Sequence, residues 1–538
     1  MSVSEQSAQP PAPLAGPGAE IAAGYAFDGA ALDLGALLWD GVCHPDAPVR
    51  IPLTMLNRHG LVAGATGTGK TKTLQLIAEQ LSGHGVPVFL ADIKGDVSGI
   101  SAPGADGEKV RERAAQVGQE WRGTGFPCEF YGLGGIGPGI PVRATVTGFG
   151  PVLLSKVLQL NKTQEQSLGL IFHYADSKGL ELVDLKDLRA VVAFLVSDLG
   201  KAELKGIGGL STATAGVILR SITAFEQQGA GGFFGEPEFD TAAFVRTAED
   251  GRGIVSVLEL PAVQDKPQLF STFLMWMLAD LFDDLPEVGD LEKPKLVFFF
   301  DEAHLLFSGA SQAFLESITQ TVRLIRSKGV GVFFVTQTPK DVPADVLGQL
   351  GNRVQHALRA FTPDDAKALK ATVRTFPKSP YDLEEVLTGL GTGEAVVTVL
   401  SEKGAPTPVA ATRLRAPESL MGPVDPAALD AAVKASPLYG RYAEAVDRES
   451  AYEKLTAEQL AAEAAALDAA AAKEAEKAQK AQTGSAQGEA RAPRQKEEPS
   501  LAEQVVGSGI FTSLARSIGT QLGREISRSI FGTARRKR

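Results

Sequence analysis

Short apolar runs separated by longer amphipathic segments recur between residues 51 and 415. The runs are rich in Val, Leu and Phe, and most end in a polar residue or a turn signal, which is typical of strands covered on both faces. They lie at 59–64, 86–92, 253–260, 295–302, 331–337, 354–361 and 394–400. Because such strands alternate with helical segments, the pattern predicts an α/β fold with a mainly parallel sheet flanked by helices.

The long segment between the second and third of these strands has a different pattern. Apolar positions in residues 163–199 follow a mostly helical period. We therefore expect a core made of residues 51–100 and 251–415, interrupted at 101–250 by a mostly helical insertion. A short N-terminal segment, 21–50, precedes the core, and the Pro/Ala-rich residues 1–20 are expected to be disordered.

Beyond residue 420 large apolar residues become sparse. Residues 420–482 are rich in Ala and Glu and predict an exposed helical segment, and residues 483–500 predict a flexible linker. Residues 501–538 predict a basic amphipathic C-terminal helix. Its apolar stripe consists of Phe511, Leu514, Ile518, Leu522, Ile526 and Ile530. Packing on the core, contact with DNA and association with a membrane surface all fit this helix.

The composition limits the compartment and the partners. A chain of 538 residues is long enough for more than one structural unit, and its net charge of −11 excludes a generally basic protein but not a basic channel. Cys43 and Cys128 form no CxxC pattern, so neither a disulfide framework nor a zinc site is indicated. The chain start lacks a signal-peptide pattern, and the most apolar run, 269–282, is too short to cross a bilayer. We expect a cytoplasmic protein without an integral membrane segment.

A complete phosphate-binding motif follows the first predicted strand. The sequence GATGTGKT at 64–71 satisfies the G-x-x-x-x-G-K-[ST] pattern and opens a helix with a helical apolar period. Its glycines let backbone N–H groups approach phosphate, the lysine reaches the β- and γ-phosphates, and the threonine hydroxyl holds Mg²⁺. ATP and Mg²⁺ are the expected cofactors. The predicted nucleotide-binding residues are Gly64, Ala65, Thr66, Gly67, Thr68, Gly69, Lys70, Thr71 and Lys72.

Two carboxylates end the apolar run at 295–302. Asp301 would complete the magnesium site with Thr71, and Glu302 would act as the general base that polarises the attacking water. Gln337 ends another apolar run, where it could contact the γ-phosphate or the water. Residues 92–96 supply Asp92, Lys94 and Asp96 at the end of a neighbouring strand. A supporting role near nucleotide or DNA and an ordinary charged loop are equally compatible with them.

An arginine from a neighbouring subunit commonly completes the site of a P-loop ATPase that does mechanical work. Candidates are Arg58, Arg323, Arg326 and Arg353, each next to a predicted strand or at a helix end.

Together these motifs resemble the HerA/FtsK branch of RecA-like motor ATPases, and most closely the bacterial HerA-like helicases of the YjgR type. The resemblance extends over most of 50–415. It implies a RecA-like core, a hexameric ring and DNA as the substrate, with Lys70, Thr71, Asp301, Glu302 and Gln337 in the roles given above. It also makes Arg326, in RSKGVG, the first choice for the catalytic arginine supplied in trans, with Arg353 second.

The resemblance has one departure. HerA proteins carry a β-barrel before the ATPase core that helps to dock a nuclease, and residues 1–50 leave no room for a full barrel, so we do not expect a nuclease partner of that kind. The leading expectation is a DNA translocase or helicase-like ATPase. The alternatives are an ATPase motor for another polymer, as in protein transfer, and a nucleotide-switched scaffold.

Overall fold

A computed structural model describes residues 13–204, 206, 208–289, 291–307 and 312–484. By its internal contacts the chain divides into two units, residues 1–460 and 461–538. The first unit holds the sheet and the helices around it. Of the second unit, the structure describes the continuation of one long helix, whose side chains up to residue 477 are mostly exposed.

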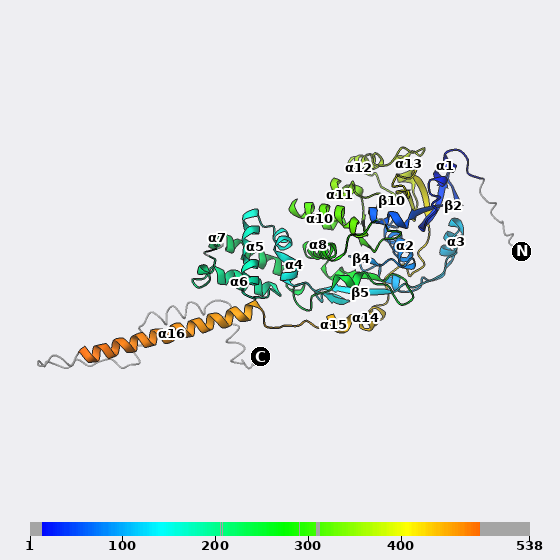
Figure 1. Ribbon diagram of the computed structural model, residues 1–538. Helices are drawn as coiled ribbons and strands as arrows, with labels where there is room; N and C mark the ends of the chain where they lie inside the picture. The colour runs from blue at the N-terminus through cyan, green and yellow to red at the C-terminus, as the bar shows by residue number, and fades with distance from the viewer. Residues whose placement is uncertain (1–12, 205, 207, 290, 308–311, 485–538) are drawn as a thin grey trace, which may run out of the picture. The chain divides into compact units, whose positions relative to one another are not determined.

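A single sheet of twelve strands forms the centre of the first unit (Figure 1). Its order is β2-β1-β12-β11-β10-β3-β9-β8-β4-β7-β5-β6. The strands are β1 Ala31–Trp39, β2 Val42–Pro52, β3 Gly60–Ala63, β4 Val88–Asp92, β5 Cys128–Leu133, β6 Ile140–Val142, β7 Val255–Glu259, β8 Leu296–Phe300, β9 Val330–Thr336, β10 Asn352–His356, β11 Glu394–Thr398 and β12 Ala410–Leu414.

The sheet has a parallel part and an antiparallel part. From β10 through β3 to β6, all neighbouring strands run parallel, whereas β10, β11, β12, β1 and β2 pair antiparallel in that order. All positions of β3, β4, β7, β8 and β9 are buried, as expected for strands covered on both faces. The predicted α/β fold class, with a mainly parallel sheet flanked by helices, is confirmed.

Helices cover the sheet and extend beside it. The longer ones are α2 Lys70–Gly83, α3 Glu108–Val117, α4 Val146–Val157, α5 Lys162–Ser177, α6 Leu185–Leu195, α7 Thr212–Gln227, α8 Pro267–Asp284, α10 Gln312–Ile325, α12 Pro363–Val373 and α14 Pro426–Ala435. Shorter helices are α1 Pro17–Ala23, α9 His304–Phe307, α11 Ala344–Leu347, α13 Leu383–Gly389 and α15 Tyr439–Tyr442. The apolar run at 269–282 forms the middle of α8, and residues 271–278 and Leu281 are buried. No helix of the described ranges is both long and apolar enough to span a lipid bilayer.

The expected insertion, 101–250, contains helices and strands. Helices α4–α7 form a group beside the sheet (Figure 1), while β5 and β6 extend the sheet itself beyond β7. The N-terminal segment also joins the sheet, because β1 pairs with β12. Residues 1–12 lie outside the described ranges, and α1 already begins at Pro17, within the segment expected to be disordered.

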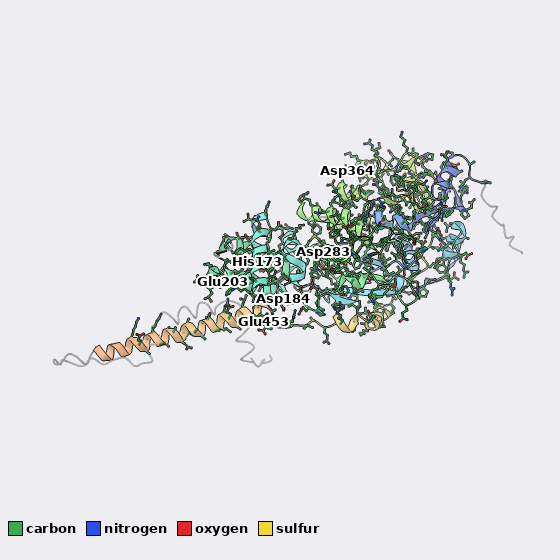
Figure 2. All side chains as sticks on the ribbon, in the orientation of Figure 1. His173, Asp184, Glu203, Asp283, Asp364 and Glu453 are labelled. Atoms are coloured by element: carbon green, nitrogen blue, oxygen red, sulfur yellow. The ribbon has the colours of Figure 1, made fainter. Side chains whose placement is uncertain are left out.

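The segment after residue 420 is partly packed on the first unit. Leu429, Val433 and Tyr442 are buried. The last helix, α16 Ala451–Gly484, begins beside α6: Lys186 Nζ donates to Glu453 Oε1 at 3.0 Å, and Figure 2 shows Glu453 near Asp184, the N-cap of α6. Residues 485–538, with most of the predicted linker and the whole basic C-terminal helix, lie outside the described residues.

Candidate functional site

The phosphate-binding loop joins β3 to α2 and is anchored on two neighbouring strands. Gly64 N donates to Thr336 O of β9 at 3.2 Å, and Ala65 N donates to Ala357 O, directly after β10, at 2.8 Å. Gly64, Gly67 and Gly69 have φ of 157°, 79° and 111°. Residues other than glycine rarely adopt the positive φ angles of Gly67 and Gly69. The shape of the loop therefore determines which positions of the motif are glycine.

His356 braces this loop from β10. A Cβ on Gly64 would lie 2.4 Å from the Cβ of His356, so only glycine permits this approach. His356 Nε2 lies 2.9 Å from the hydroxyl of Thr73 on α2, and the Gly393 N–H donates to Thr68 O at 3.0 Å. Burial lowers the pKa of His356 to about 4, so the ring is neutral at pH 7 and acts as a structural contact.

Lys70, the first residue of α2, bends back over the loop. Its Nζ donates to Gly64 O at 2.7 Å and to Ala65 O at 3.1 Å. Burial lowers the pKa of Lys70, and the opposing charge of Glu302 partly compensates. The Lys70 ammonium therefore lies against the loop, and the negative charges of Glu302 and Asp301, which follow β8, act on it.

Asp301 and Glu302 follow β8 at the carboxyl edge of the parallel sheet. Both are buried, with exposed fractions of 3% and 6%. Asp301 Oδ1 accepts from Glu302 N at 2.9 Å, whereas Asp301 Oδ2 and Glu302 Oε2 have no hydrogen-bond partner among the residues that the structure describes. Burial, and next the charge of Glu302, raise the pKa of Asp301 to about 7. Buried acceptors without partners are costly for folding and are typical of sites that bind a ligand or ion.

The backbone of Glu302 is also unusual. Its φ is +48°, in the left-handed region that residues other than glycine seldom occupy. The following residue is fixed to the sheet, since Ala303 N donates to Val335 O of β9 at 2.8 Å. A strained backbone next to an anchored one holds the carboxylate in a defined position.

Lys94 reaches the same carboxylate from the loop after β4. Its Nζ donates to Glu302 Oε1 in a short ion pair. His304 Nδ1 lies 3.2 Å from Glu302 Oε2, within ion-pair distance but without hydrogen-bond geometry. Burial, the largest single influence, lowers the pKa of Lys94, but the hydrogen bond to Glu302 and the negative charges of Glu302, Asp301 and Asp96 together outweigh it, so the pKa is raised.

The other predicted residues of the site lie around this centre. Gln337 follows β9, directly after the Thr336 carbonyl that accepts from the loop, and its side chain is exposed. Thr71 and Lys72 lie in the first turn of α2 and are half-buried. Lys72 Nζ donates to Gln75 Oε1 at 3.3 Å. Thr66 and Gly67 are exposed at the tip of the loop.

The two candidate arginines do not lie at this centre. Arg326 is exposed and precedes β9, which runs for seven residues, or roughly 20 Å, before it meets the loop. Arg353 is the second residue of β10, and its guanidinium donates to Leu350 O at 3.4 Å and Thr375 O at 3.2 Å. Burial lowers the pKa of Arg353.

The contact between Lys94 and Glu302 and the brace by His356 are the features that the sequence did not reveal. Residues 92–96 attracted attention as a charged strand end, but nothing in one sequence pairs a lysine with a carboxylate 208 positions away. His356 carried no signal beyond its position in an apolar run.

The amino-acid sequence is similar to a known protein family and to individual proteins that are named helicases. The helicase HerA-like C-terminal family matches residues 40–538. A probable helicase of Methanocaldococcus jannaschii is 30% identical over 153 residues, which cover 27% of this chain and 28% of that protein. The DNA double-strand break repair helicase HerA of Sulfurisphaera tokodaii is 33% identical over 108 residues, 20% of this chain and 21% of that protein. The matches thus span about a quarter of these relatives.

Solved structures that are similar to this one include the bacterial conjugative coupling protein TrwB. It is 14% identical, with a TM-score of 0.48 over 74% of this chain and 91% of that one. VirB4 of Thermoanaerobacter pseudethanolicus is also 14% identical, with a TM-score of 0.44 over 72% of this chain and 97% of that one. We infer nothing about activity from likenesses at this level. With a complete phosphate-binding loop and a family match over nearly its whole length, the chain belongs to the helicase HerA-like C-terminal family.

Proposed function

We propose that this chain is an ATP-hydrolysing motor that moves along DNA as a ring of six identical subunits. One observation carries the proposal. Buried carboxylates with unpartnered oxygens, Asp301 and Glu302, lie at the same edge of the sheet as the phosphate-binding loop and close enough to Lys70 to affect its pKa. A binding loop without turnover has no need for a buried base at this position.

The residues present fit Mg²⁺ and a triphosphate. Loop N–H groups and Lys70 would bind phosphate oxygens, because within the described part of the chain the Lys70 ammonium donates to carbonyls of the loop itself. The Thr71 hydroxyl and the open Oδ2 of Asp301 would hold Mg²⁺, which prefers oxygen ligands. The bound ion would neutralise charge that develops on the phosphates. Glu302 would take a proton from the attacking water, and Gln337 would orient the γ-phosphate or that water.

The arginines support an assembly in which subunits share sites. Arg326 lies a strand length away from the loop of its own chain, so it can complete a site only on a neighbouring subunit. Arg353, the second candidate, donates to two carbonyls of its own chain. An arginine of this kind contributes a factor of about 10³–10⁵ to the rate of hydrolysis in other ATPases.

The proposal that the motor moves along DNA is based on the relatives of this chain. Both curated relatives are named helicases, and one is named for DNA double-strand break repair. Sequence-independent binding to phosphates would suit a motor that moves along its substrate, and such binding weakens steeply with salt.

ATP turnover with and without DNA tests this proposal. We expect single- or double-stranded DNA to accelerate hydrolysis by the wild-type chain, and Arg326→Ala to remove most of the turnover without unfolding the protein. Native mass in the presence of nucleotide should show a hexamer. Turnover that no DNA of any length changes would favour a motor for another polymer, and absence of turnover despite nucleotide binding would favour a switched scaffold. A strictly monomeric nucleotide-bound protein would contradict both the ring and the shared arginine.

A further inference from the structure

Glu302, the proposed general base, forms an ion pair with Lys94. Glu302 Oε1 accepts a hydrogen bond from the Lys94 ammonium, and Oε2 faces His304 Nδ1 at 3.2 Å. A carboxylate that is bonded to a cation is a weaker proton acceptor, and its best lone pairs point at that cation instead of at water. As long as this pair persists, Glu302 is poorly placed to activate a water molecule.

The loop after β4 is built to direct Lys94 at this carboxylate. The carboxylate of Asp92 accepts from the backbone N–H groups of Lys94, Gly95 and Val97, at 3.1, 2.7 and 2.8 Å. Gly95 has a φ of +72°, and a Cβ at this position would lie 2.9 Å from Pro261 Cγ. The backbone on both sides of Lys94 is therefore fixed by contacts that have nothing to do with Glu302.

The two partners differ in their freedom to move. The Lys94 side chain is 47% exposed, whereas that of Glu302 is 7% exposed. The backbone of Glu302 also has a strained, positive φ. Lys94 can therefore change partners by rotating its flexible stem through solvent, and Glu302 cannot leave. Lys70 lies close to both, since the charges of Glu302 and Lys94 each act on its pKa. A γ-phosphate bound at Lys70 would bring a second, more strongly charged anion within reach of Lys94.

We propose that Lys94 is a nucleotide-sensing positioning residue: it holds Glu302 aside in the ATP-free and ADP-bound protein, and transfers to the γ-phosphate when ATP binds. This inference rests on the proposed function. Transfer frees the Glu302 carboxylate at the moment at which there is a phosphate to attack. Hydrolysis and loss of phosphate return Lys94 to Glu302 and close the site to unproductive water.

Zero-length cross-linking with a carbodiimide tests the transfer directly, because the reagent joins an amine only to a carboxylate in contact with it. We expect a Lys94–Glu302 cross-linked peptide, detected by mass spectrometry, in the protein alone and with ADP. With the non-hydrolysable analogue AMPPNP and Mg²⁺, its yield should fall about tenfold. The pair Lys178–Glu203, at 2.7 Å and far from the loop in sequence, is the internal control and should cross-link equally in all three samples.

Affinities for AMPPNP and ADP give a second, independent measurement. In Lys94→Met, affinity for AMPPNP should fall about tenfold, since a charge-assisted contact is lost, while affinity for ADP stays within twofold. Lys94→Arg should retain most of the preference, and Lys293→Met, which removes a lysine that donates to the carbonyls of His84 and Gly85, should match the wild type.

Three results would overturn the inference. They are a cross-link that is absent without nucleotide, a cross-link that persists with bound AMPPNP, and equal losses of AMPPNP and ADP affinity in Lys94→Met, which would indicate a merely structural lysine. If the wild type binds both nucleotides and hydrolyses ATP, each of these results leaves the proposed function intact. A wild type that binds neither nucleotide overturns the proposed function and this inference with it.

Discussion

The carboxyl ends of β4 and β8 are adjacent in the sheet and carry the same residue type, yet they differ in how its charge is satisfied. Asp92 and Asp301 are both buried, and burial is the main reason why the pKa of each is raised. Asp92 accepts three backbone N–H groups. Asp301 accepts one, and its Oδ2 has no partner.

This difference separates a structural carboxylate from a candidate catalytic one. At the end of β4 the acceptor capacity is used by the chain itself and determines the shape of the following loop. At the end of β8 it is left open, beside Lys70 and Glu302. An unsatisfied buried acceptor destabilises the folded protein, so its presence at this position indicates that binding of a ligand or ion repays the cost.

After the proposed base Glu302 and the shared arginine, the largest expected effect of a substitution is at the cradle that faces the open end of β8. Lys70→Met should reduce ATP hydrolysis by about 10²–10³-fold, because one preorganised cation at the phosphates is lost. Steady-state turnover measures this effect, and Lys293→Met serves as the matched control. Hydrolysis within a few-fold of the wild type would show that the cradle of the loop is not the reaction site.

Substitution of each aspartate by asparagine should distinguish the structural role of Asp92 from the proposed catalytic role of Asp301. Asp301→Asn should lower hydrolysis about 10²-fold and leave the unfolding temperature near that of the wild type. Asp92→Asn should instead lower the free energy of unfolding by about 1–3 kcal/mol, because the amide cannot accept all three N–H groups. Turnover and thermal unfolding of both variants are the measurements. Equal loss of stability in both would contradict the distinction drawn between them.

Glu259, at the end of the next strand, β7, gives a pH-dependent version of the comparison. It is 4% exposed, its Oε1 has no partner, and burial, with a smaller effect of Asp92, raises its pKa to about 8. A raised pKa means that the folded state holds the proton more tightly than the unfolded state, whose glutamate pKa is about 4.3. Stability should therefore fall as the pH rises from about 4 to 8 and then level off.

In Glu259→Gln this contribution to the pH dependence should be absent. The variant should match the wild type near pH 4 and unfold at a temperature a few degrees higher at pH 8. Thermal unfolding across this range measures the gap. A gap that is constant with pH would show that Glu259 ionises in the folded protein as it does in the unfolded chain.

The smallest expected effect is at Gly95, which completes the turn formed around Asp92. Gly95→Ala should cost about 1 kcal/mol of stability, because alanine disfavours a positive φ and its Cβ would approach Pro261. Denaturant unfolding provides the value. Gly67→Ala, with a φ of +79° and nothing within 4 Å of the added Cβ, is the control for strain without contact. If the two costs are equal, the packing of Gly95 on Pro261 contributes nothing.

The parallel core could be predicted from sequence because its signals are local. A strand buried on both faces reads as an unbroken apolar run, and each predicted run overlaps a strand of the sheet, although β10 already ends at His356, within the run predicted at 354–361. The glycines of the loop are fixed by backbone conformation, so GATGTGKT predicts its strand-to-helix context, which the structure confirms. Asp301 and Glu302 were predictable for the same reason, as polar residues directly after a buried run.

The remaining strands were not predicted because their partners are distant or their patterns are mixed. β1 contains Asp33 and Gly35 among its apolar residues, and β6 has three residues. β1 depends on β12, far along the chain, and β6 pairs with β5, which in turn depends on the distant β7 for its position in the sheet. The contact of Lys94 with Glu302 is a long-range side-chain contact of the same kind. Propensity and period do not determine such contacts; the packing of the sheet does.

Hydrolysis by Glu302→Gln tests the central claim most directly. The substitution keeps the size of the side chain and removes its ability to accept a proton. We predict that the variant binds AMPPNP within a few-fold of the wild type and hydrolyses ATP about 10³-fold more slowly, with DNA present. Turnover at the wild-type rate in this variant would contradict the assignment of the β8 carboxyl end as the catalytic centre.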